Sequence, residues 1–377
     1  MTIEEAKKVL EEIYFAGTGN GGVISAILIG KSGVGKTEGH LQLAKKLAEK
    51  TGKELIILDD VEKVERVMAA PDKYFVDVEF LLTQSSPEDF MGMPRDEKDY
   101  IVYKPLAWAR VLSRCSGILF LDEFTNVQRL DVQSAVLKIL LEKRVGFTKM
   151  CDNVFVLAAG NSPEDSELAI DRLPEPIRRG RVVTLKVSPP TMVEWIDYMN
   201  NKYGEEWDKR IGAFLYKFPE KFYEKVDKGD DGYSPIASPR TWSKIAITSK
   251  RLSEENLEKF MYGMLSKETA SIVMSFLNTK VPDISELDED PTRWRTLGTD
   301  SRYFLILEVS NMEPKEVVKH EKFLTYLSDT DREWIVLLFM FMGGDDKKRE
   351  VAYILKDKAP KVFKALLESS ILSKRLS

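Results

Sequence analysis

The stretch that decides the fold is Gly30-Lys31-Ser32-Gly33-Val34-Gly35-Lys36-Thr37, which follows directly on an apolar run at residues 23–29. Its spacing, G-x-x-x-x-G-K-[ST], is typical of a loop whose backbone N–H groups enclose phosphates. Gly30 and Gly35 permit a tight loop because they lack a Cβ. Lys36 supplies a positive charge for the phosphates, and the Thr37 hydroxyl supplies a ligand for Mg²⁺. The stretch therefore predicts a binding site for a nucleoside triphosphate.

A helix is predicted directly after this loop, as the motif requires. Residues 38–51 carry apolar side chains at helical spacing, namely Leu41, Ala44, Leu47 and Ala48. The N-terminus of such a helix attracts the negative charge of phosphate groups. We expect the residues of the loop, and Glu38 immediately after it, to contact the nucleotide.

Two carboxylates end a second apolar run. Residues 117–121 contain no polar side chain and are followed by Asp122 and Glu123, a pattern that favours a strand buried on both faces. In open α/β sheets the carboxyl ends of the strands point at the binding site. We expect Asp122 to hold the ligand shell of Mg²⁺ and Glu123 to polarise the attacking water.

Four further polar residues complete the candidate site. Residues 154–159 predict another buried strand, and Asn161, just beyond it, can orient the water against the γ-phosphate. The guanidinium groups of Arg178 and Arg181 can neutralise charge on a transferring phosphoryl group. An arginine cluster is also common on a solvated surface. Arg240 lies near the start of a predicted helix, directly after a proline suited to a first helical turn.

The pattern of strands and helices indicates an α/β fold followed by helical segments. Apolar strands alternate with helical patterns up to about residue 190, which favours a mostly parallel sheet covered by helices. Residues 74–82 predict a further strand, and residues 55–58 a shorter extra one. An acidic segment that ends in proline, residues 283–291, marks a boundary. We divide the chain into a nucleotide-binding core, a helical lid and a C-terminal helical extension: residues 1–190, 191–282 and 283–377.

Composition limits the possible functions. The chain of 377 residues has a formal net charge of −5, which weighs against sequence-independent nucleic-acid binding as its main role. Cys115 and Cys151 are isolated, so neither a disulfide framework nor a zinc site is supported. His40 and His320 are too far apart in the sequence for a histidine-based metal site.

No segment predicts secretion or membrane insertion. The first residues read as an amphipathic helix rather than a secretory signal. The longest apolar run, residues 334–342, is too short to cross a bilayer. We expect a cytoplasmic protein.

Together these motifs resemble the AAA+ ATPases and, among them, the MoxR-like and dynein-related group, over roughly residues 20–280. Residues 30–37 are similar to Walker A, residues 119–123 to Walker B, and Asn161 to sensor 1. Residues 87–94 and 137–145 resemble segments of MoxR-like proteins. Arg181 is the best positional match to the arginine finger and Arg178 the second, and the resemblance does not decide between them. Arg240 resembles sensor 2.

The resemblance implies a hydrolase of ATP with Mg²⁺ as its cofactor. It implies a five-stranded parallel sheet in the order 5-1-4-3-2 and a homo-oligomeric ring, expected to be a hexamer, in which an arginine finger completes the neighbouring site. MoxR-like proteins are chaperone-like remodellers, so a protein substrate or a von Willebrand factor A-domain partner is expected.

Two other functions stay open. One is a nucleic-acid translocase or a replication or packaging helper, and the other is an assembly module that binds ATP but scarcely hydrolyses it. Residues 83–104 and 144–153 are candidate loops for contacting a substrate in the pore of a ring, or are solvated connections.

Overall fold

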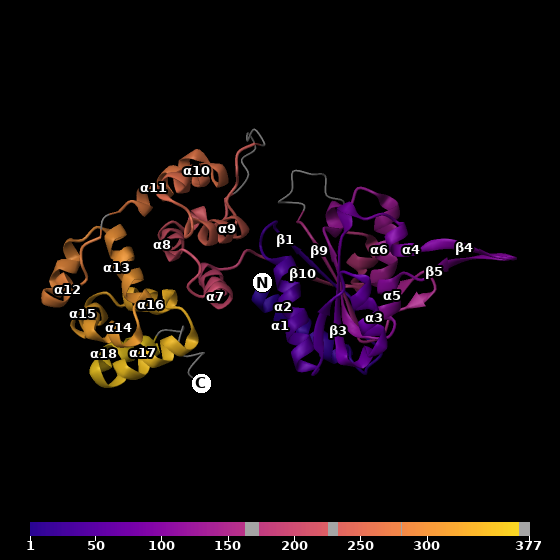
Figure 1. The fold of residues 1–377 in the computed structure, drawn as a ribbon, viewed down its shortest axis with the longest axis horizontal. Helices are drawn as coiled ribbons and strands as arrows, with labels where there is room; N and C mark the ends of the chain where they lie inside the picture. Colours follow the sequence, from indigo (N-terminus) through magenta and orange to yellow (C-terminus); the bar gives the residue numbers. More distant parts are fainter. Residues whose placement is uncertain (163–172, 225–232, 280, 369–377) are drawn as a thin grey trace. The chain divides into compact units, whose positions relative to one another are not determined.

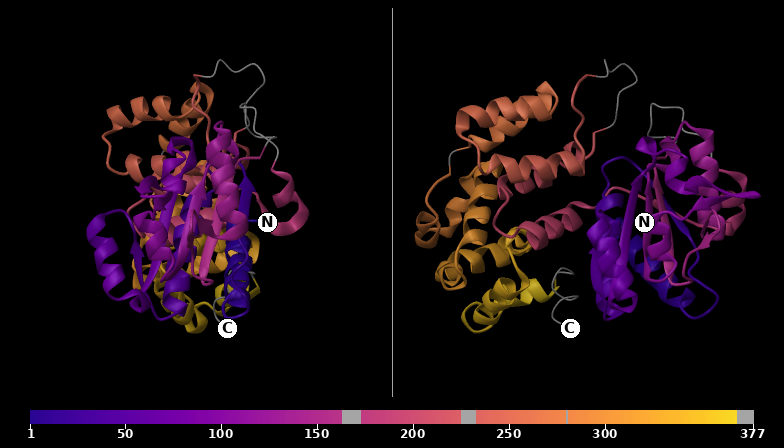
Figure 2. Two further views of the ribbon diagram at one scale, coloured as in Figure 1. Left: turned by 90° about the vertical axis from the view of Figure 1, so that its right-hand side faces the viewer. Right: turned by 45° about the vertical axis from the view of Figure 1, so that its right-hand side comes forward.

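The computed structural model describes residues 1–162, 173–224, 233–279 and 281–368. The chain forms two compact units, Met1–Pro189 and Pro190–Ser377 (Figure 1). The first contains a parallel sheet with helices on both of its sides (Figure 2), and the described part of the second is helical. The predicted class, an α/β core followed by a helical region, is confirmed.

Six parallel strands form the sheet, in the order β10-β1-β9-β6-β3-β2. Their bounds are Val183–Val187 (β10), Ala26–Gly30 (β1), Val154–Gly160 (β9), Ser116–Asp122 (β6), Tyr74–Leu81 (β3) and Glu54–Ile57 (β2). At the centre, Leu28 lies beside both Leu185 and Ala159. Every residue of β1 and β9 is buried, as expected of strands covered on both faces.

The expected number of strands, five, is wrong. The predicted order 5-1-4-3-2 occurs as β10, β1, β9, β6 and β3, and β2 adds a sixth strand at the edge beside β3. Only Ile56 among the four residues of β2 is buried. The short apolar run at residues 55–58 made this segment a candidate for an extra strand.

Helices cover the two faces of the sheet. Tyr14 of α1 (Ile3–Gly17) contacts Phe75 of β3 and Phe155 of β9 through its ring. The next residue on each strand, Val76 and Val156, points to the opposite face. There the core includes residues of three further helices, namely α3 (Val61–Ala69), α5 (Ala107–Leu112) and α6 (Leu130–Glu142). The helix that follows the phosphate loop, α2 (Lys36–Lys50), packs against α1 and β3.

Two short antiparallel hairpins extend the first unit. The strands β4 (Met93–Glu97) and β5 (Tyr100–Lys104) form one hairpin, which projects away from the sheet (Figure 1). The strands β7 (Arg144–Val145) and β8 (Thr148–Lys149) form the other. Both lie in segments for which the sequence predicts loops. The strand residues of the first hairpin are mostly exposed. Because neither face of the hairpin is buried, its sequence shows no alternation of apolar and polar side chains that would predict a strand.

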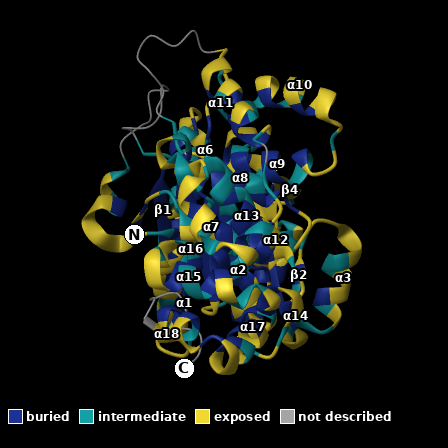
Figure 3. Cartoon of the chain, turned by 90° about the vertical axis from the view of Figure 1, so that its left-hand side faces the viewer, coloured by how far each residue is buried: buried dark blue, intermediate teal, exposed yellow. Residues whose placement is uncertain are grey.

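The second unit contains helices α7 to α18. Their bounds are Met192–Tyr203 (α7), Lys209–Lys217 (α8), Pro239–Ser249 (α9), Glu254–Met264 (α10), Lys267–Leu277 (α11), Ser285–Glu289 (α12), Thr299–Asn311 (α13), Pro314–Val317 (α14), Glu321–Thr330 (α15), Arg332–Phe341 (α16), Asp345–Lys358 (α17) and Pro360–Glu368 (α18). One hydrophobic core includes residues from Trp195 to Leu366. Figure 3 shows the contrast between α8, which is mostly buried, and α10, whose outer side is exposed. Among the described residues, no helix is long and apolar enough to cross a membrane.

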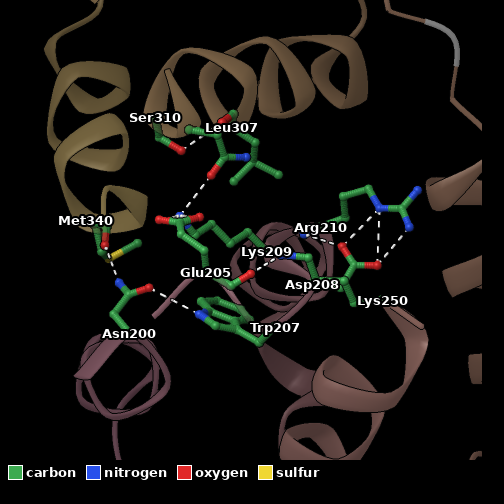
Figure 4. Close-up of polar contacts among 11 residues, drawn as sticks. Asn200, Glu205, Trp207, Asp208, Lys209, Arg210, Lys250, Leu307, Ser310 and Met340 are labelled. Atoms are coloured by element: carbon green, nitrogen blue, oxygen red, sulfur yellow. Dashed lines mark hydrogen bonds and ion pairs between the residues drawn. The ribbon is translucent and has the colours of Figure 1, made fainter. Parts of the chain in front are cut away.

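A polar cluster joins the early and late helices of this unit (Figure 4). The Lys209 ammonium donates to both carboxylate oxygens of Glu205, at 2.9 Å each, and to the side-chain oxygen of Asn311 at 2.8 Å. Burial lowers the pKa of Lys209, and the adjacent Glu205 carboxylate opposes that effect. The Asn200 amide donates to the Met340 carbonyl at 3.2 Å. These contacts tie α7 and α8 to α13 and α16 in addition to the shared apolar core.

Lys143 ends α6 just before the second hairpin. It has a left-handed backbone conformation (φ +50°), and its ammonium donates to the Val154 carbonyl at the start of β9, at 2.5 Å. Burial lowers the pKa of Lys143 to about 8, with a smaller opposing effect from Asp152. The hydrogen bond from Lys143 thus fixes the end of α6 to the sheet. Burial of the ammonium makes its charged form less favourable in the folded chain than in water.

We expect the free energy of unfolding to rise with pH between about 8 and 10.5 because of Lys143. The unfolded chain binds this proton up to about pH 10.5, whereas the folded chain releases it near pH 8, and stability rises wherever the unfolded state holds more protons. The gain is at most about 3 kcal/mol. Urea unfolding of wild type and Lys143→Met at a series of pH values measures it.

The difference in stability between the two proteins should change across this pH range. Lys138→Met, which alters an exposed lysine of the same helix, should show no such change. A constant difference between wild type and Lys143→Met from pH 8 to 10.5 would contradict the prediction.

Candidate active site

The phosphate loop connects β1 to α2. Gly33 and Gly35 have positive φ angles of +75° and +96°, a conformation that glycine adopts without strain. The ammonium of Lys36 is buried and donates to the carbonyl oxygens of Gly30 and Lys31, at 2.8 and 2.7 Å. The loop therefore curls around the lysine and leaves the N-terminus of α2 at its mouth, where phosphate binds favourably.

Gly30 is required for a different reason from the one that the sequence suggests. Its φ is not among the positive values. A Cβ at this position would lie 2.3 Å from the carbonyl oxygen of Val187 in β10, which is closer than atoms can approach. Gly30 thus permits the close pairing of β1 with β10, whereas Gly33 and Gly35 shape the loop.

Thr37 and Asp122 lie together at the edge of the sheet. The Thr37 hydroxyl donates to Asp122 Oδ2 at 2.7 Å, and Asp122 Oδ1 accepts the N–H of Glu123 at 2.8 Å. A hydroxyl and a carboxylate oxygen are ligands that suit Mg²⁺, which commonly takes one or two carboxylates together with substrate phosphates. The donor set therefore fits this ion beside the phosphate loop.

Glu123 is held in a strained turn. Its φ of +59° lies in the left-handed region, which is uncommon for residues other than glycine. Its carboxylate accepts a hydrogen bond from the Thr83 hydroxyl at 2.7 Å. Thr83 is not among the site residues that the sequence predicts. The only available signal was its place just beyond the strand predicted at residues 74–82, which the expected strand order puts beside the Walker B strand.

Asn161 follows β9 and faces the same site. Its side-chain oxygen accepts a hydrogen bond from the Lys36 ammonium at 3.2 Å. Its backbone N–H and carbonyl both bond to the hydroxyl of Thr125, at 2.7 and 3.2 Å. The structure thus connects Lys36 to Asn161 and Thr37 to Asp122.

A buried histidine supports the helix behind the loop. His40 lies one turn after Thr37, and its Nε2 is 3.3 Å from Asp77 Oδ2 in β3. Both side chains are fully buried, and the imidazole stacks on Phe120 of β6 with ring centroids 3.7 Å apart. His40 is thus a packing residue that fixes α2 against the two strands. Its partner was not predictable, because a single histidine in a helical pattern carries no signal of what it contacts.

The two candidate arginine fingers lie on the surface. Arg178 and Arg181 belong to the short helical turn η5 (Ile177–Arg181) that precedes β10, and both are exposed. Among the described residues, neither has an ion-pair partner, whereas Arg179 between them pairs with Glu175. In the part of the chain that the structure describes, neither Arg178 nor Arg181 forms a hydrogen bond with Asp122.

Arg240 belongs to the second unit. It is exposed in the first turn of α9, directly after the capping residue Ser238 and Pro239. The Ser238 hydroxyl accepts the N–H of Thr241 at 3.3 Å and so begins the helix, as the sequence predicts. The other predicted site residues all lie in the first unit.

One family model matches most of the first unit. Residues 26–186 match the model described as ATPase family associated with various cellular activities (AAA). The match includes the phosphate loop, Asp122, Glu123, Asn161 and both candidate finger arginines. No curated protein matches the sequence.

Several solved structures are similar to the chain, with low sequence identity. C. elegans PCH-2 is 15% identical, with 72% of this chain and 66% of that chain covered and a TM-score of 0.32. The Aeropyrum pernix ORC1 protein in complex with DNA is 14% identical, with 99% and 94% covered and a TM-score of 0.36. The FIGL-1 AAA domain in complex with ADP is 15% identical, with 78% and 88% covered and a TM-score of 0.38.

Replacing Glu123 by Gln tests its role in the reaction. The amide keeps the size of the side chain but cannot accept a proton, so ATP should still bind while the turnover number falls by about 10²- to 10⁴-fold. Steady-state hydrolysis and equilibrium binding of a fluorescent ATP analogue measure the two effects. Glu142→Gln, at an exposed position at the end of α6, is the control. Unchanged hydrolysis by Glu123→Gln would remove Glu123 from this role.

Proposed function

We propose that this protein is a Mg²⁺-dependent, ring-forming ATPase of the MoxR-like type that remodels protein complexes, because residues 26–186 match the AAA ATPase family model. The observation that carries the proposal is the pair of contacts from the phosphate loop to the strand ends, Lys36 to Asn161 and Thr37 to Asp122. The contacts bring the Lys36 ammonium close to the Asn161 amide, and the Thr37 hydroxyl close to the Asp122 carboxylate, at one edge of the sheet, which supports the proposal.

Each residue of the site has a defined role in the proposal. Lys36 and the loop amides hold the phosphates, while Thr37 and Asp122 hold Mg²⁺, which would neutralise phosphate charge when bound. Glu123 takes a proton from the attacking water, and its hydrogen bond from Thr83 fixes the direction of the carboxylate. Asn161 orients that water.

The helical region supplies the lid and the extension of the proposed ATPase. We assign residues 1–190 to the nucleotide-binding core, residues 191–282 to a lid and residues 283–377 to a helical extension. Arg240, exposed at the start of α9, would bind nucleotide from the lid and couple its state to lid motion. The core that includes residues from Trp195 to Leu366 would make the lid and the extension move together.

Hydrolysis is proposed to require a neighbouring subunit. The exposed guanidinium groups of Arg178 and Arg181, without an ion-pair partner among the described residues, are available to a second copy of the chain. A guanidinium that reaches across an interface stabilises charge on the transferring phosphoryl group. We propose a hexamer, in which one of these arginines completes the site of the next subunit.

The two hairpins form an apolar surface suited to a polypeptide. Met91, Met93, Tyr100, Ile101, Tyr103 and Phe147, here called the hairpin surface, are all exposed, Phe147 to 78%. Gly146, at the turn of the second hairpin, lies against Met91 and Tyr103, because a Cβ there would be 3.5 Å from the Met91 carbonyl oxygen. The hairpins are therefore adjacent. Exposed apolar groups gathered in this way mark interaction surfaces.

The charges of the first hairpin favour protein over nucleic acid as the substrate. Residues 93–104 contain three basic and three acidic side chains, so they have no net charge. A surface that tracks a phosphate backbone needs an excess of lysine and arginine. We propose that the hairpin surface binds exposed apolar segments of a protein substrate, with a von Willebrand factor A-domain protein as a possible partner. The free thiols Cys115 and Cys151 suit a cytoplasmic location.

Mixing two inactive variants tests the shared site. Arg181→Ala lacks the finger but keeps the catalytic residues, and Glu123→Gln lacks the base but keeps the finger. If the finger acts in the neighbouring subunit, mixed rings contain complete sites and hydrolyse ATP, although neither variant does so alone. The same mixture made with Arg178→Ala shows which arginine is the finger.

A mixture of Glu123→Gln with Lys36→Ala is the control, because neither variant has a site that can hydrolyse ATP even with a finger from its neighbour. It should stay inactive. If neither arginine variant recovers activity in rings that light scattering shows to be mixed, the finger does not act between subunits.

Replacing Tyr100 and Ile101 together by alanine tests the hairpin surface. Each exposed side chain that a substrate buries contributes about 1.5–3 kcal/mol, so casein, an unfolded polypeptide, should bind at least about tenfold more weakly. Fluorescence anisotropy of labelled casein measures the affinity. Tyr353→Ala, which removes an equally exposed tyrosine from α17, should bind casein as wild type does.

Stimulation of hydrolysis separates the two substrate classes. Casein, but not single-stranded DNA, should raise the ATPase rate of the wild-type protein. A salt-sensitive rise with DNA alone, unaffected by the loss of Tyr100 and Ile101, would instead support a nucleic-acid translocase.

A further inference from the structure

Thr125 lies in the turn that follows Glu123, and its hydroxyl contacts the backbone of Asn161. It lies in η3 (Phe124–Asn126), two residues after Glu123, and only 6% of it is exposed. We propose that Thr125 is a positioning residue that sets the orientation of Asn161 for hydrolysis. The inference rests on the role given to Asn161 in the proposed function.

One hydroxyl satisfies both backbone groups of Asn161. Thr125 Oγ1 accepts the N–H of Asn161 at 2.7 Å and donates to its carbonyl oxygen at 3.2 Å. Asn161 has just left the strand β9, so the parallel ladder no longer fixes its backbone. A hydroxyl that acts as donor and acceptor at the same time can replace that ladder with a single side chain.

The neighbouring glycine fits the threonine closely. A Cβ at Gly160 would lie 2.6 Å from Thr125 Cγ2 and 2.8 Å from Thr125 Oγ1. Any other residue at position 160 would push the hydroxyl away from the Asn161 backbone. The contact therefore depends on three residues. Gly160 leaves space for the Thr125 side chain, and the Thr125 hydroxyl forms hydrogen bonds that fix the backbone of Asn161.

The position of Thr125 affects both Asn161 and Glu123. The side chain of Asn161 contacts Lys36, and the turn that carries Thr125 starts from Glu123, whose carbonyl accepts the N–H of Asn126 at 2.9 Å. Thr125 thus fixes the distance between the base and the amide that orients the water. A displacement of this kind lowers the rate of the chemical step more than the affinity for nucleotide.

Two substitutions separate the hydroxyl from the packing. Thr125→Val keeps the shape and the methyl contact with Gly160 but leaves the N–H and carbonyl of Asn161 unpaired. Thr125→Ser keeps the hydroxyl and loses the methyl group. We expect Thr125→Val to lower the turnover number about 10- to 100-fold with the Kd of ADP within about twofold of wild type, and Thr125→Ser to stay within about threefold in turnover.

A double-mutant cycle with Asn161→Ala shows whether Thr125 acts through Asn161. Once the amide is absent, orienting it has no value, so Thr125→Val together with Asn161→Ala should turn over as slowly as Asn161→Ala alone. Thermal unfolding of the four proteins and binding of ADP confirm that each is folded.

Three results would overturn the inference. One is an equal loss of turnover in Thr125→Ser and Thr125→Val, and another is a full additional loss when Thr125→Val is added to Asn161→Ala. The third is wild-type turnover by Thr125→Val while Asn161→Ala is inactive. This result would exclude a role for Thr125 and leave the role of Asn161 in place. Wild-type turnover by Asn161→Ala would instead show that the role of Asn161 in the proposed function is wrong.

Discussion

The parallel direction of four neighbouring strands is the constraint on which the site depends. Because β1, β9, β6 and β3 run the same way, their carboxyl ends meet at one edge of the sheet. Residues as distant in sequence as Lys36 and Asn161 then come within hydrogen-bond distance. Thr37 meets Asp122 for the same reason. A reversal of any one of these strands would move the polar side chain that follows it to the opposite edge.

Two glycines, which have no side chain, allow neighbouring segments of the chain to approach closely. At Gly30 a Cβ would collide with Val187, and at Gly160 it would collide with Thr125. Each glycine lies at the end of a strand, where the chain turns from the sheet into the site. Glu123 adds backbone strain at the end of a third strand. The edge that carries the chemistry is therefore held by close packing and a strained turn rather than by the sheet ladder alone.

The predictable part of the molecule is the part with a strong local pattern. The buried strands β1, β6 and β9 were recognisable because both of their faces are apolar, and the expected order of five strands occurs in the sheet. The exposed hairpin of β4 and β5 carries no such pattern, and the short apolar run at residues 55–58 gave only a candidate for an extra strand. Arg178, Arg181 and Arg240 are on the surface, where a single chain gives no partner to test them against.

The class of reaction is predictable from the residues alone, because phosphate and Mg²⁺ demand particular residues at a fixed spacing, and that spacing is local at Gly30 to Thr37. Asp122 and Asn161 could be added because each follows an apolar run. The contacts of Thr83 with Glu123 and of Thr125 with Asn161 are visible only in the folded chain. Neither Thr83 nor Thr125 belongs to a recognisable sequence motif. Each hydroxyl acts because packing brings it within about 3 Å of a partner atom that is distant in the sequence.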